Sequence, residues 1–447
     1  MYKSSSNTVR HAIQKRQDTR DLAVQVLLRL EGTQTPVQAV LNEVVTRATC
    51  NPMDTALCSE LCYGVLRMEI RLLWLLSRFL KVPEKLPTRM RCILLVAVYS
   101  LLFLESMPDY AIVDWAVGNV KRKHGQVLAR VANACLRAIC REGDAPRDYD
   151  YYHNAGQDEQ ARQALFHSLP LWIVRLWHDG YGPDKAARLM AKSSSRPAAG
   201  IRVNQQRTNW EELAQQLDDA GAQRLAPACF VVAPELRTCL EKQCSLAMLL
   251  GEGRLSRQGG ASLLSLYALL STNLPDPLWD ACAGQGTKSC ALLELGKDVR
   301  MASDTHLPRL LRIGGECHRL RLPQPLLTQA SALHPPLGYK PGSIILDVPC
   351  SGLGVLSSRP DIRRHRKAEH VQALVHCQAG MLEAAYTALS TGGHIAYITC
   401  TQNPAENEKQ IRDFLTRYPT VELAQEWNSP AEDMLLEGMY AALLVKQ

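Results

Sequence analysis

Although the chain contains fifteen cysteines, no two are spaced Cys-x-x-Cys, and none falls in a cysteine and histidine pattern typical of zinc sites. No stretch reaches the roughly 18 uninterrupted apolar residues of a membrane helix, and the first residues lack the apolar core of a secretion signal. Repeats of fixed period and low-complexity tracts are also absent. These absences argue against a structural metal, a membrane span and secretion. We therefore expect a cytoplasmic protein with reduced thiols.

The composition predicts a folded protein of several domains with a basic surface. Hydrophobic residues make up 46% and charged residues 21% of the 447 residues, a length that suggests two to four domains. The formal net charge is +7, and basic residues cluster at 122–123, 309–321 and 359–367. Such an excess is common on a solvated surface, but it also suits a polyanionic partner such as nucleic acid.

Hydrophobic periodicity divides the chain into three parts, and the first two are a helical part and a short mixed part. Residues 1–145 are predicted to form a helical bundle, in which the apolar stretch 92–104 is a central helix covered on every side. Residues 146–240 begin with a polar linker and continue as a small α+β module, with extended runs near 200–204 and 229–232.

The third part, residues 241–447, alternates strands and helices regularly. Expected strands lie at 278–281, 299–303, 343–347 and 394–399. This alternation predicts a parallel, doubly wound α/β sheet, which binds ligands at the carboxyl edge of its strands.

A glycine-rich loop follows the first of these strands and is a candidate cofactor site. The segment Cys282-Ala-Gly-Gln-Gly-Thr-Lys288 lets the backbone turn sharply and approach a nucleotide-like ligand, although a simple glycine-rich turn has the same pattern. Asp304 follows the next strand, at about the distance in sequence from the loop at which an acidic side chain binds ribose hydroxyls in nucleotide-binding folds. Alternatively, Asp304 is the N-cap of the helix that follows. The loop lacks the spacing of a triphosphate-binding motif. A cofactor with ribose and adenine but no triphosphate fits better.

Two cysteines at the ends of later strands point to covalent chemistry. Cys350 and Cys400 each follow an apolar strand, and although a lone cysteine is usually core, a pair at one sheet edge suggests a nucleophilic role. A thiolate that adds to carbon 6 of a pyrimidine makes carbon 5 able to accept a methyl group from a sulfonium donor, and a second group then helps resolve the adduct. Asp347 is placed to hydrogen-bond the N3/N4 edge of such a pyrimidine base. Alternatively, it caps a nearby helix or turn. Spacing does not decide which cysteine attacks.

These motifs resemble those of a known enzyme group. Asp347-Val-Pro-Cys-Ser-Gly-Leu-Gly-Val, followed by Arg359-Pro-Asp-Ile-Arg, and Tyr397-Ile-Thr-Cys-Thr-Gln-Asn-Pro-Ala-Glu-Asn-Glu are similar to the RNA cytosine-5 methyltransferases of the NOP2/Sun group. The N-terminal bundle resembles the NusB family, notably in Glu60-Leu-Cys-Tyr-Gly-Val-Leu-Arg67. This layout is typical of bacterial members that methylate 16S ribosomal RNA.

The resemblance implies a multidomain protein with an all-α NusB-like bundle, a small α+β module and a Rossmann-type domain that uses S-adenosylmethionine. It assigns Cys400 as the nucleophile, Cys350 to product release and Asp347 to the reacting centre. Its expected partner is RNA, either 16S ribosomal RNA or the assembling small subunit, with no membrane partner and a monomeric chain. The remaining expected contacts are, for the cofactor, Cys282, Ala283, Gly284, Gln285, Gly286, Thr287, Lys288, Asp304 and Asp347, and for RNA, Arg202, Asn204, Arg359 and Arg363.

The sequence departs from the family pattern around the cofactor. The usual Ala-Pro-Gly-Gly-Lys is replaced by Ala283-Gly-Gln-Gly-Thr-Lys, residues 320–331 contain no acid, and Gly259 stands where an acid is expected after Gln258. Weaker or rearranged cofactor binding is therefore expected. Two alternatives stay open: a non-catalytic RNA-binding protein with a degraded cofactor site, and the same chemistry on transfer RNA or another ribosomal site.

Overall fold

The computed structural model describes residues 18–104, 107–270 and 273–447. Contacts divide the chain into two compact units, Met1–Asn154 and Ala155–Gln447. Across the described ranges, no helix has the length and apolar character needed to span a membrane, and no cluster of three or more potential metal ligands occurs.

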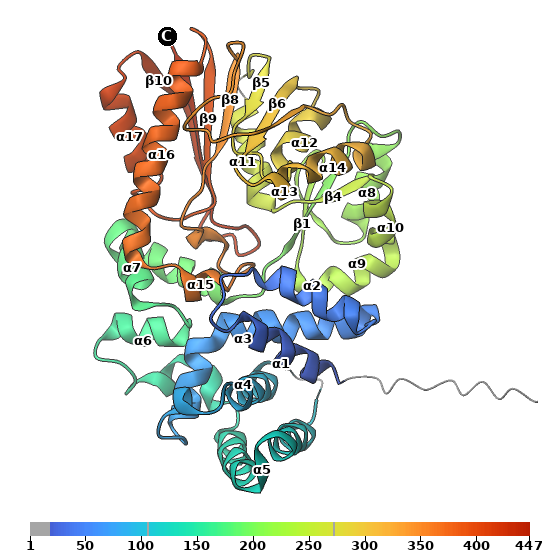
Figure 1. Ribbon diagram of the computed structural model, residues 1–447, viewed down its shortest axis with the longest axis vertical. Coiled ribbons are helices and arrows are strands. Elements are labelled where there is room, and N and C mark those ends of the chain that lie inside the picture. The colour runs from blue at the N-terminus through green and yellow to red at the C-terminus, as the bar shows by residue number, and fades with distance from the viewer. Residues whose placement is uncertain (1–17, 105–106, 271–272) are drawn as a thin grey trace, which may run out of the picture. The chain divides into compact units, whose positions relative to one another are not determined.

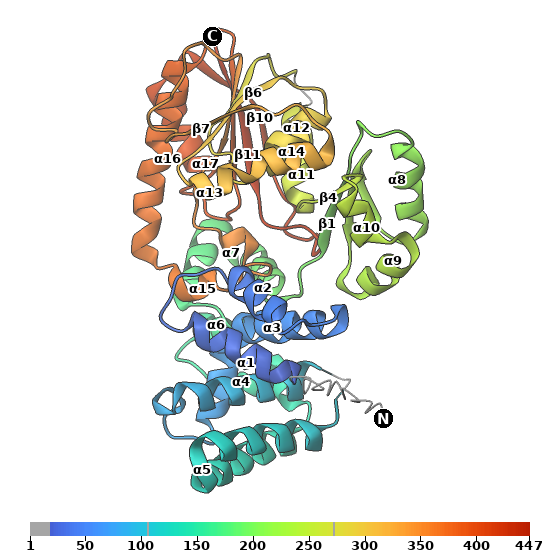
Figure 2. The same cartoon turned by 45° about the vertical axis from the view of Figure 1, so that its right-hand side comes forward.

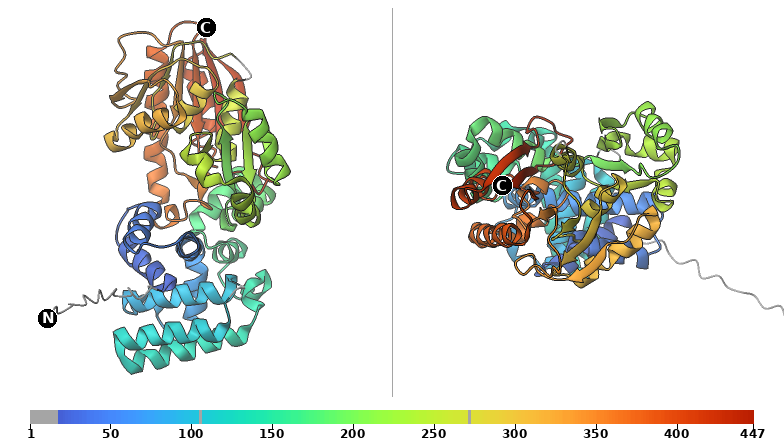
Figure 3. Two further views of the ribbon diagram at one scale, coloured as in Figure 1. Left: turned by 90° about the vertical axis from the view of Figure 1, so that its right-hand side faces the viewer. Right: turned by 90° about the horizontal axis from the view of Figure 1, so that it is seen from above.

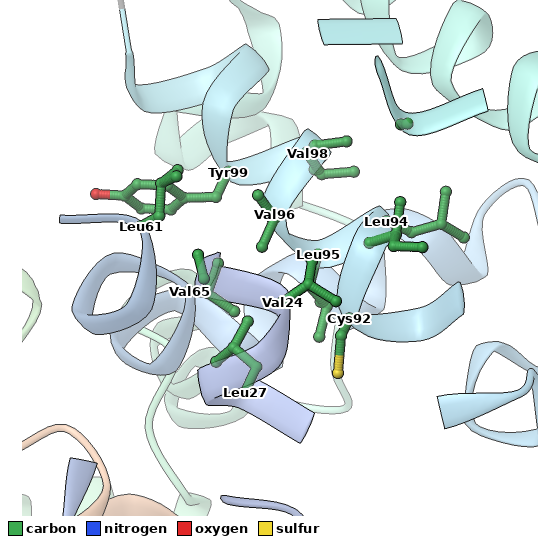
Figure 4. Close-up of a cluster of buried hydrophobic side chains, with 14 of the residues drawn as sticks. Val24, Leu27, Leu61, Val65, Cys92, Leu94, Leu95, Val96, Val98 and Tyr99 are labelled. Atoms are coloured by element: carbon green, nitrogen blue, oxygen red, sulfur yellow. The ribbon is translucent and has the colours of Figure 1, made fainter. Parts of the chain in front are cut away.

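The first unit is a helical bundle, as predicted (Figure 1). The apolar stretch 92–104 lies almost wholly in α4, whose side chains from Cys92 to Ser100 are at most 3% exposed, which confirms a central helix. Figure 4 shows side chains of α1 and α3 gathered around it. A Cβ atom on Gly64 of α3 would collide with the Tyr99 ring of α4, so the close approach of these helices depends on this glycine. The main helices are α1 (Thr19–Leu30), α2 (Val37–Arg47), α3 (Pro52–Ser77), α4 (Thr88–Phe103) and α5 (Asp109–Glu142).

The second unit begins with two helices and a small antiparallel sheet of order β2-β3-β1-β4. Both predicted extended runs are strands, but the sheet takes a fourth strand beyond residue 240, and the expected boundary there falls inside α9. The sheet packs on α11 (Figures 2 and 3). The elements are α6 (Glu159–Phe166), α7 (Leu171–Ser194), β1 (Ala199–Val203), α8 (Trp210–Asp219), β2 (Gln223–Ala226), β3 (Cys229–Val232), α9 (Arg237–Cys244), α10 (Leu246–Gly251) and β4 (Leu255–Arg257).

A larger sheet of order β10-β11-β9-β8-β5-β6-β7 forms the centre of the rest of the second unit. Strands β7, β6, β5, β8 and β9 are parallel and β11 and β10 antiparallel, so the doubly wound prediction is confirmed, while β7, β10 and β11 were not predicted. Helices α11, α12 and α14 lie on one side of the sheet and α16 and α17 on the other (Figure 1). A separate apolar cluster packs between the sheet and each set of helices. The elements are α11 (Gly260–Leu270), β5 (Leu278–Asp280), α12 (Thr287–Glu294), β6 (Val299–Asp304), α13 (Leu307–Leu310), α14 (Arg312–Leu320), β7 (Leu326–Gln329), β8 (Ser343–Asp347), α15 (Ile362–His365), α16 (Ala368–Ala388), β9 (His394–Thr399), α17 (Glu408–Arg417), β10 (Val421–Asn428) and β11 (Tyr440–Lys446).

A buried ion pair joins the small sheet to the larger domain. Arg202 of β1 donates from Nε and Nη2 to the Glu294 carboxylate of α12, at 2.6 and 3.0 Å. Its Nη1 donates to the carbonyl oxygen of Thr287, at the start of α12. The two charged side chains are 5% and 2% exposed, so each charge depends on the other for compensation.

We expect Arg202→Met to destabilise the protein by about 3–5 kcal/mol, because it leaves the Glu294 carboxylate buried without its cation. Urea unfolding followed by circular dichroism measures this change. The double variant Arg202→Met/Glu294→Met should regain most of the loss. As a control, Arg300→Met removes an exposed pair with Asp298 and should change stability by at most about 1 kcal/mol; equal losses at both sites would contradict the prediction.

Candidate active site

The two candidate cysteines lie next to each other at the carboxyl edge of the large sheet. Strands β8 and β9 are neighbouring and parallel, with Asp347 opposite Ile398, so the segments that follow them leave the sheet side by side. The sulfur atoms of Cys350 and Cys400 are 3.3 Å apart. The sequence prediction that both thiols meet at this edge is therefore confirmed.

The surroundings of the two thiols give them different acidities. A hydrogen bond from Cys350 lowers the pKa of Cys400, with further lowering from Arg359 and Lys288, although burial and Asp347 oppose it. The same hydrogen bond and burial hold the pKa of Cys350 well above its usual value. Because the thiolate is the reactive form of cysteine, these environments favour Cys400 as the nucleophile and leave Cys350 protonated.

This difference predicts the pattern of alkylation by iodoacetamide. We expect Cys400 to react faster than Cys350, and its pH midpoint to rise in Cys350→Ala, because that variant loses the thiol that donates to Cys400. Peptide mapping by mass spectrometry across a pH series measures both rates. The control Cys377→Ala removes a half-buried cysteine of α16 and should leave the midpoint unchanged. Equal reactivity of the two thiols would contradict the assignment.

A lysine from the glycine-rich loop region stands beside these thiols. Lys288 Nζ donates to Asp347 Oδ2 at 2.5 Å. Burial alone would lower the pKa of Lys288, but the charge and hydrogen bond of Asp347, with smaller contributions from Cys400 and Asp280, raise it. Asp347 is about a third exposed, with a side-chain accessibility of 34%, and in the described part of the chain it bonds Lys288 rather than a turn backbone. Asp347 is thus partly exposed beside Lys288, and the turn-capping alternative is not supported.

The loop 282–288 is held in shape by its neighbours and leaves space beside it. Ala283 N donates to Ser303 O at 2.9 Å, which ties the loop to β6. Gly286 has φ 79°, and a Cβ atom there would lie 2.8 Å from the Ile313 side chain, so glycine is required. At Gly284 a Cβ atom would meet nothing within 4 Å. The altered loop therefore still presents an open, closely approachable backbone, which fits a nucleoside cofactor.

Asp304 lies at the end of β6 and faces this loop. Its Oδ2 accepts from Gly284 N at 2.9 Å and its Oδ1 from His306 N at 2.7 Å. The N-cap of α13 is His306, so the alternative role of Asp304 as that cap is wrong. Each carboxylate oxygen can accept more than one hydrogen bond. Asp304 can therefore still accept a hydrogen bond from a ribose hydroxyl.

One of the two missing acids is replaced from elsewhere in the chain. A Cβ atom on Gly259 would collide with the Glu437 carboxylate, which accepts from Ala261 N at 3.1 Å in the first turn of α11. At the end of β7, by contrast, Gln329 donates its amide to Thr305 O at 3.0 Å. At Gly259, therefore, the expected acid is absent but the Glu437 carboxylate occupies the same place. At the end of β7, the neutral amide of Gln329 stands where no acid is available.

Sequence reasoning missed the buried carboxylate that joins the two cysteine loops. Glu406 is 0% exposed and accepts from Ser351 N at 2.8 Å, Gln378 Nε2 at 3.0 Å and Asn403 Nδ2 at 2.8 Å. The Ser351 hydroxyl also donates to it. Glu406 stands in the motif that follows Cys400, but only the fold brings it to the segment after β8. It fixes the two loops relative to each other.

Three of the four predicted RNA contacts need correction. Arg202, Asn204 and Arg363 are 4%, 1% and 7% exposed. Arg202 forms an ion pair with Glu294. Arg363 donates to the carbonyl oxygens of residues 167, 168 and 193. Buried and bonded inside the protein, these side chains hold the domain together. Arg359 is exposed and close enough to lower the pKa of Cys400, so it alone keeps the predicted placement.

Comparison with known proteins follows the same division of the chain. The family described as 16S rRNA methyltransferase RsmB/F matches residues 267–443, the NusB family residues 17–141, and the ferredoxin-like domain of RsmF/B-like methyltransferases residues 169–233. Ribosomal RNA small subunit methyltransferase B of Vibrio cholerae is 30% identical over 89% of this chain and 90% of its own length. The Vibrio vulnificus protein of that name is 29% identical over 96% and 100%.

Solved structures agree at the level of the fold. PH0851 superposes with a TM-score of 0.75 at 20% identity, over 96% of this chain and 98% of its own. NSun6 from Pyrococcus horikoshii, solved with SFG, gives a TM-score of 0.53 at 20% identity, over 63% and 99%. The Vibrio cholerae relative, 30% identical along nearly its whole length, shows that the chain belongs to the ribosomal RNA small subunit methyltransferase B (RsmB) family.

Proposed function

We propose that the protein methylates carbon 5 of a cytosine in 16S ribosomal RNA through a covalent bond between Cys400 and carbon 6. The observation that carries the proposal is the pair of sulfur atoms 3.3 Å apart, with the pKa of Cys400 lowered and that of Cys350 raised. A more acidic thiol beside one that keeps its proton is what attack and subsequent release require of two neighbouring groups.

Each residue of this site has its own role in the proposed reaction. Cys400 adds to carbon 6, and the electron pair then makes carbon 5 nucleophilic. The cofactor S-adenosylmethionine, when bound, supplies the methyl group as a sulfonium. Solvent water then takes the carbon-5 proton, the electron pair of that C–H bond returns to the ring, and the bond between carbon 6 and sulfur breaks to expel the Cys400 thiolate. The neighbouring Cys350 thiol assists by donating a hydrogen bond to the departing thiolate. Asp347, partly exposed beside the thiols, orients the N3/N4 edge of the base.

The proposed cofactor contacts are the loop 282–288 and Asp304. The open space beside Gly284 and the Asp304 carboxylate at the end of β6 support them. The structural neighbour solved with SFG, an analogue of S-adenosylmethionine, supports the choice of cofactor. The names of the relatives support small-subunit ribosomal RNA as substrate. The proposal also takes the protein to be a cytoplasmic monomer.

Incubation with methyl-labelled S-adenosylmethionine and unmodified small-subunit RNA tests the proposal. We expect label in 5-methylcytosine after nuclease digestion, and none with transfer RNA or large-subunit RNA. Calorimetric titration with S-adenosylmethionine runs in parallel. Cofactor and RNA binding without any label would overturn the enzymatic proposal, absence of cofactor binding would favour the non-catalytic RNA-binding alternative, and label in transfer RNA alone would change the substrate.

A further inference from the structure

A basic pocket lies in the second unit, apart from the cysteine site. It is open and has a volume of about 450 Å³. Three chain segments form it: the loop after β1, the residue before β4, and the end of α14. It is lined by Gln206, Arg207, Thr208, Asn209, Arg254 and Arg321.

The pocket carries three guanidinium groups and no acid among its lining residues. Within the described ranges, neither Arg207, Arg254 nor Arg321 is paired with a carboxylate; Arg207 donates only to the backbone oxygen of Glu252, at 3.0 Å. Nearby Arg319, in contrast, is paired with Glu316 at 2.6 Å. No carboxylate of the described ranges therefore pairs with the three arginines of the pocket.

Asn204, which the sequence placed among RNA contacts, holds the three segments of this pocket together. Its backbone N donates to Arg254 O at 2.9 Å, and its backbone O accepts from Arg207 N at 3.2 Å. Its side-chain Nδ2 donates to Leu320 O at 2.9 Å, directly before Arg321. The side chain is buried, so the arrangement is fixed before any ligand binds.

The backbone of Arg321 adds an independent indication. It is the C-terminal cap of α14 and has φ 59° and ψ 44°, the left-handed conformation that favours glycine at this position. The Arg321 side chain is exposed and makes no hydrogen bond among the described residues, so it gives no folding advantage there. Its side chain does, however, complete the wall of the pocket.

We propose that this pocket binds a backbone phosphate of the RNA substrate, outside the nucleotide that is methylated. Helices α12 and α14 run from the carboxyl edge of the sheet back to the starts of β6 and β7, so their ends stand at the edge opposite to Cys350 and Cys400. A phosphate bound there fixes RNA position without reading sequence. The inference rests on the proposed function only in taking RNA as the substrate.

Equilibrium binding to small-subunit RNA without cofactor, over a salt series, tests the pocket independently of methylation. We expect Arg207→Gln/Arg254→Gln/Arg321→Gln to weaken binding about tenfold or more and to lower the slope of log K against log salt by about 0.7–0.9 for each phosphate that the variant no longer binds. The Michaelis constant for RNA should rise while kcat at saturating RNA stays unchanged. The charge-matched control Arg188→Gln/Arg257→Gln/Arg417→Gln removes three exposed arginines outside the pocket.

A single variant separates binding from folding. Arg321→Gly suits the left-handed backbone, so its melting temperature should stay the same or rise while RNA affinity falls about two- to fivefold. Equal affinity and slope in the triple variant and its charge-matched control would overturn the inference, as would absence of RNA binding by the wild type. Loss of methylation with intact, pocket-dependent RNA binding would instead count against the proposed function alone.

Discussion

Cys350→Ala should accumulate a covalent complex with RNA that survives denaturing electrophoresis, whereas Cys400→Ala should form none. The reason lies in the two thiols 3.3 Å apart, of which Cys400 has the lowered pKa and Cys350 the raised one. In the proposed mechanism, attack on carbon 6 should still occur without Cys350, but the group assigned to release is missing. Turnover should then fall by about 10²- to 10⁴-fold, the usual contribution of a positioned proton-transfer group, and Cys400→Ala should show no methylation.

The experiment uses labelled small-subunit RNA with S-adenosylmethionine and scores a shifted band that protease digestion removes. Cys377→Ala is the matched control, because it removes a half-buried cysteine of α16 and should turn over like the wild type. The double variant Cys350→Ala/Cys400→Ala should form no adduct. Adduct accumulation in Cys400→Ala, and none in Cys350→Ala, would exchange the two roles.

The placement of the thiols is predictable because it depends on local pattern. Apolar runs end at Asp347 and Thr399, and alternation with helices makes such strands parallel, so residues that follow them meet at one edge. The proposed order of attack is not predictable from spacing, because the difference in acidity comes mainly from the hydrogen bond between Cys350 and Cys400, with smaller contributions from Arg359 and Lys288 near Cys400. Only the family resemblance supplies that order, and the electrostatics of the site favour the same one.

The wrong predictions share a physical origin in long-range pairing. The family resemblance suggests Arg202 as an RNA contact, but its partner Glu294 is 92 residues away in sequence and pairs with it inside the protein. Likewise, Gly259 suggests a lost acid, although Glu437, distant in sequence, brings a carboxylate to its side. No window of local sequence contains either partner.

Glu406→Gln should lower methylation by about 10²-fold, which is the size of effect expected when reacting groups are misplaced by about 1 Å. The carboxylate accepts hydrogen bonds from Ser351, Gln378 and Asn403, and a glutamine amide cannot accept at both of its ends. At least one buried donor therefore loses its acceptor, at about 1–3 kcal/mol. The segments carrying Cys350 and Cys400 then lose their fixed separation.

The distinguishing measurement is the alkylation of Cys400 in this variant. If Glu406 acts by positioning the two cysteine loops, the pH midpoint for Cys400 should rise toward that of Cys350→Ala, while calorimetric affinity for S-adenosylmethionine stays close to wild type, because Glu406 lies outside the loop 282–288. The control Glu383→Gln changes an exposed glutamate of α16 that bonds Tyr418, and it should leave methylation and alkylation unchanged. A variant that loses stability but keeps the wild-type alkylation midpoint would reduce Glu406 to a purely structural residue.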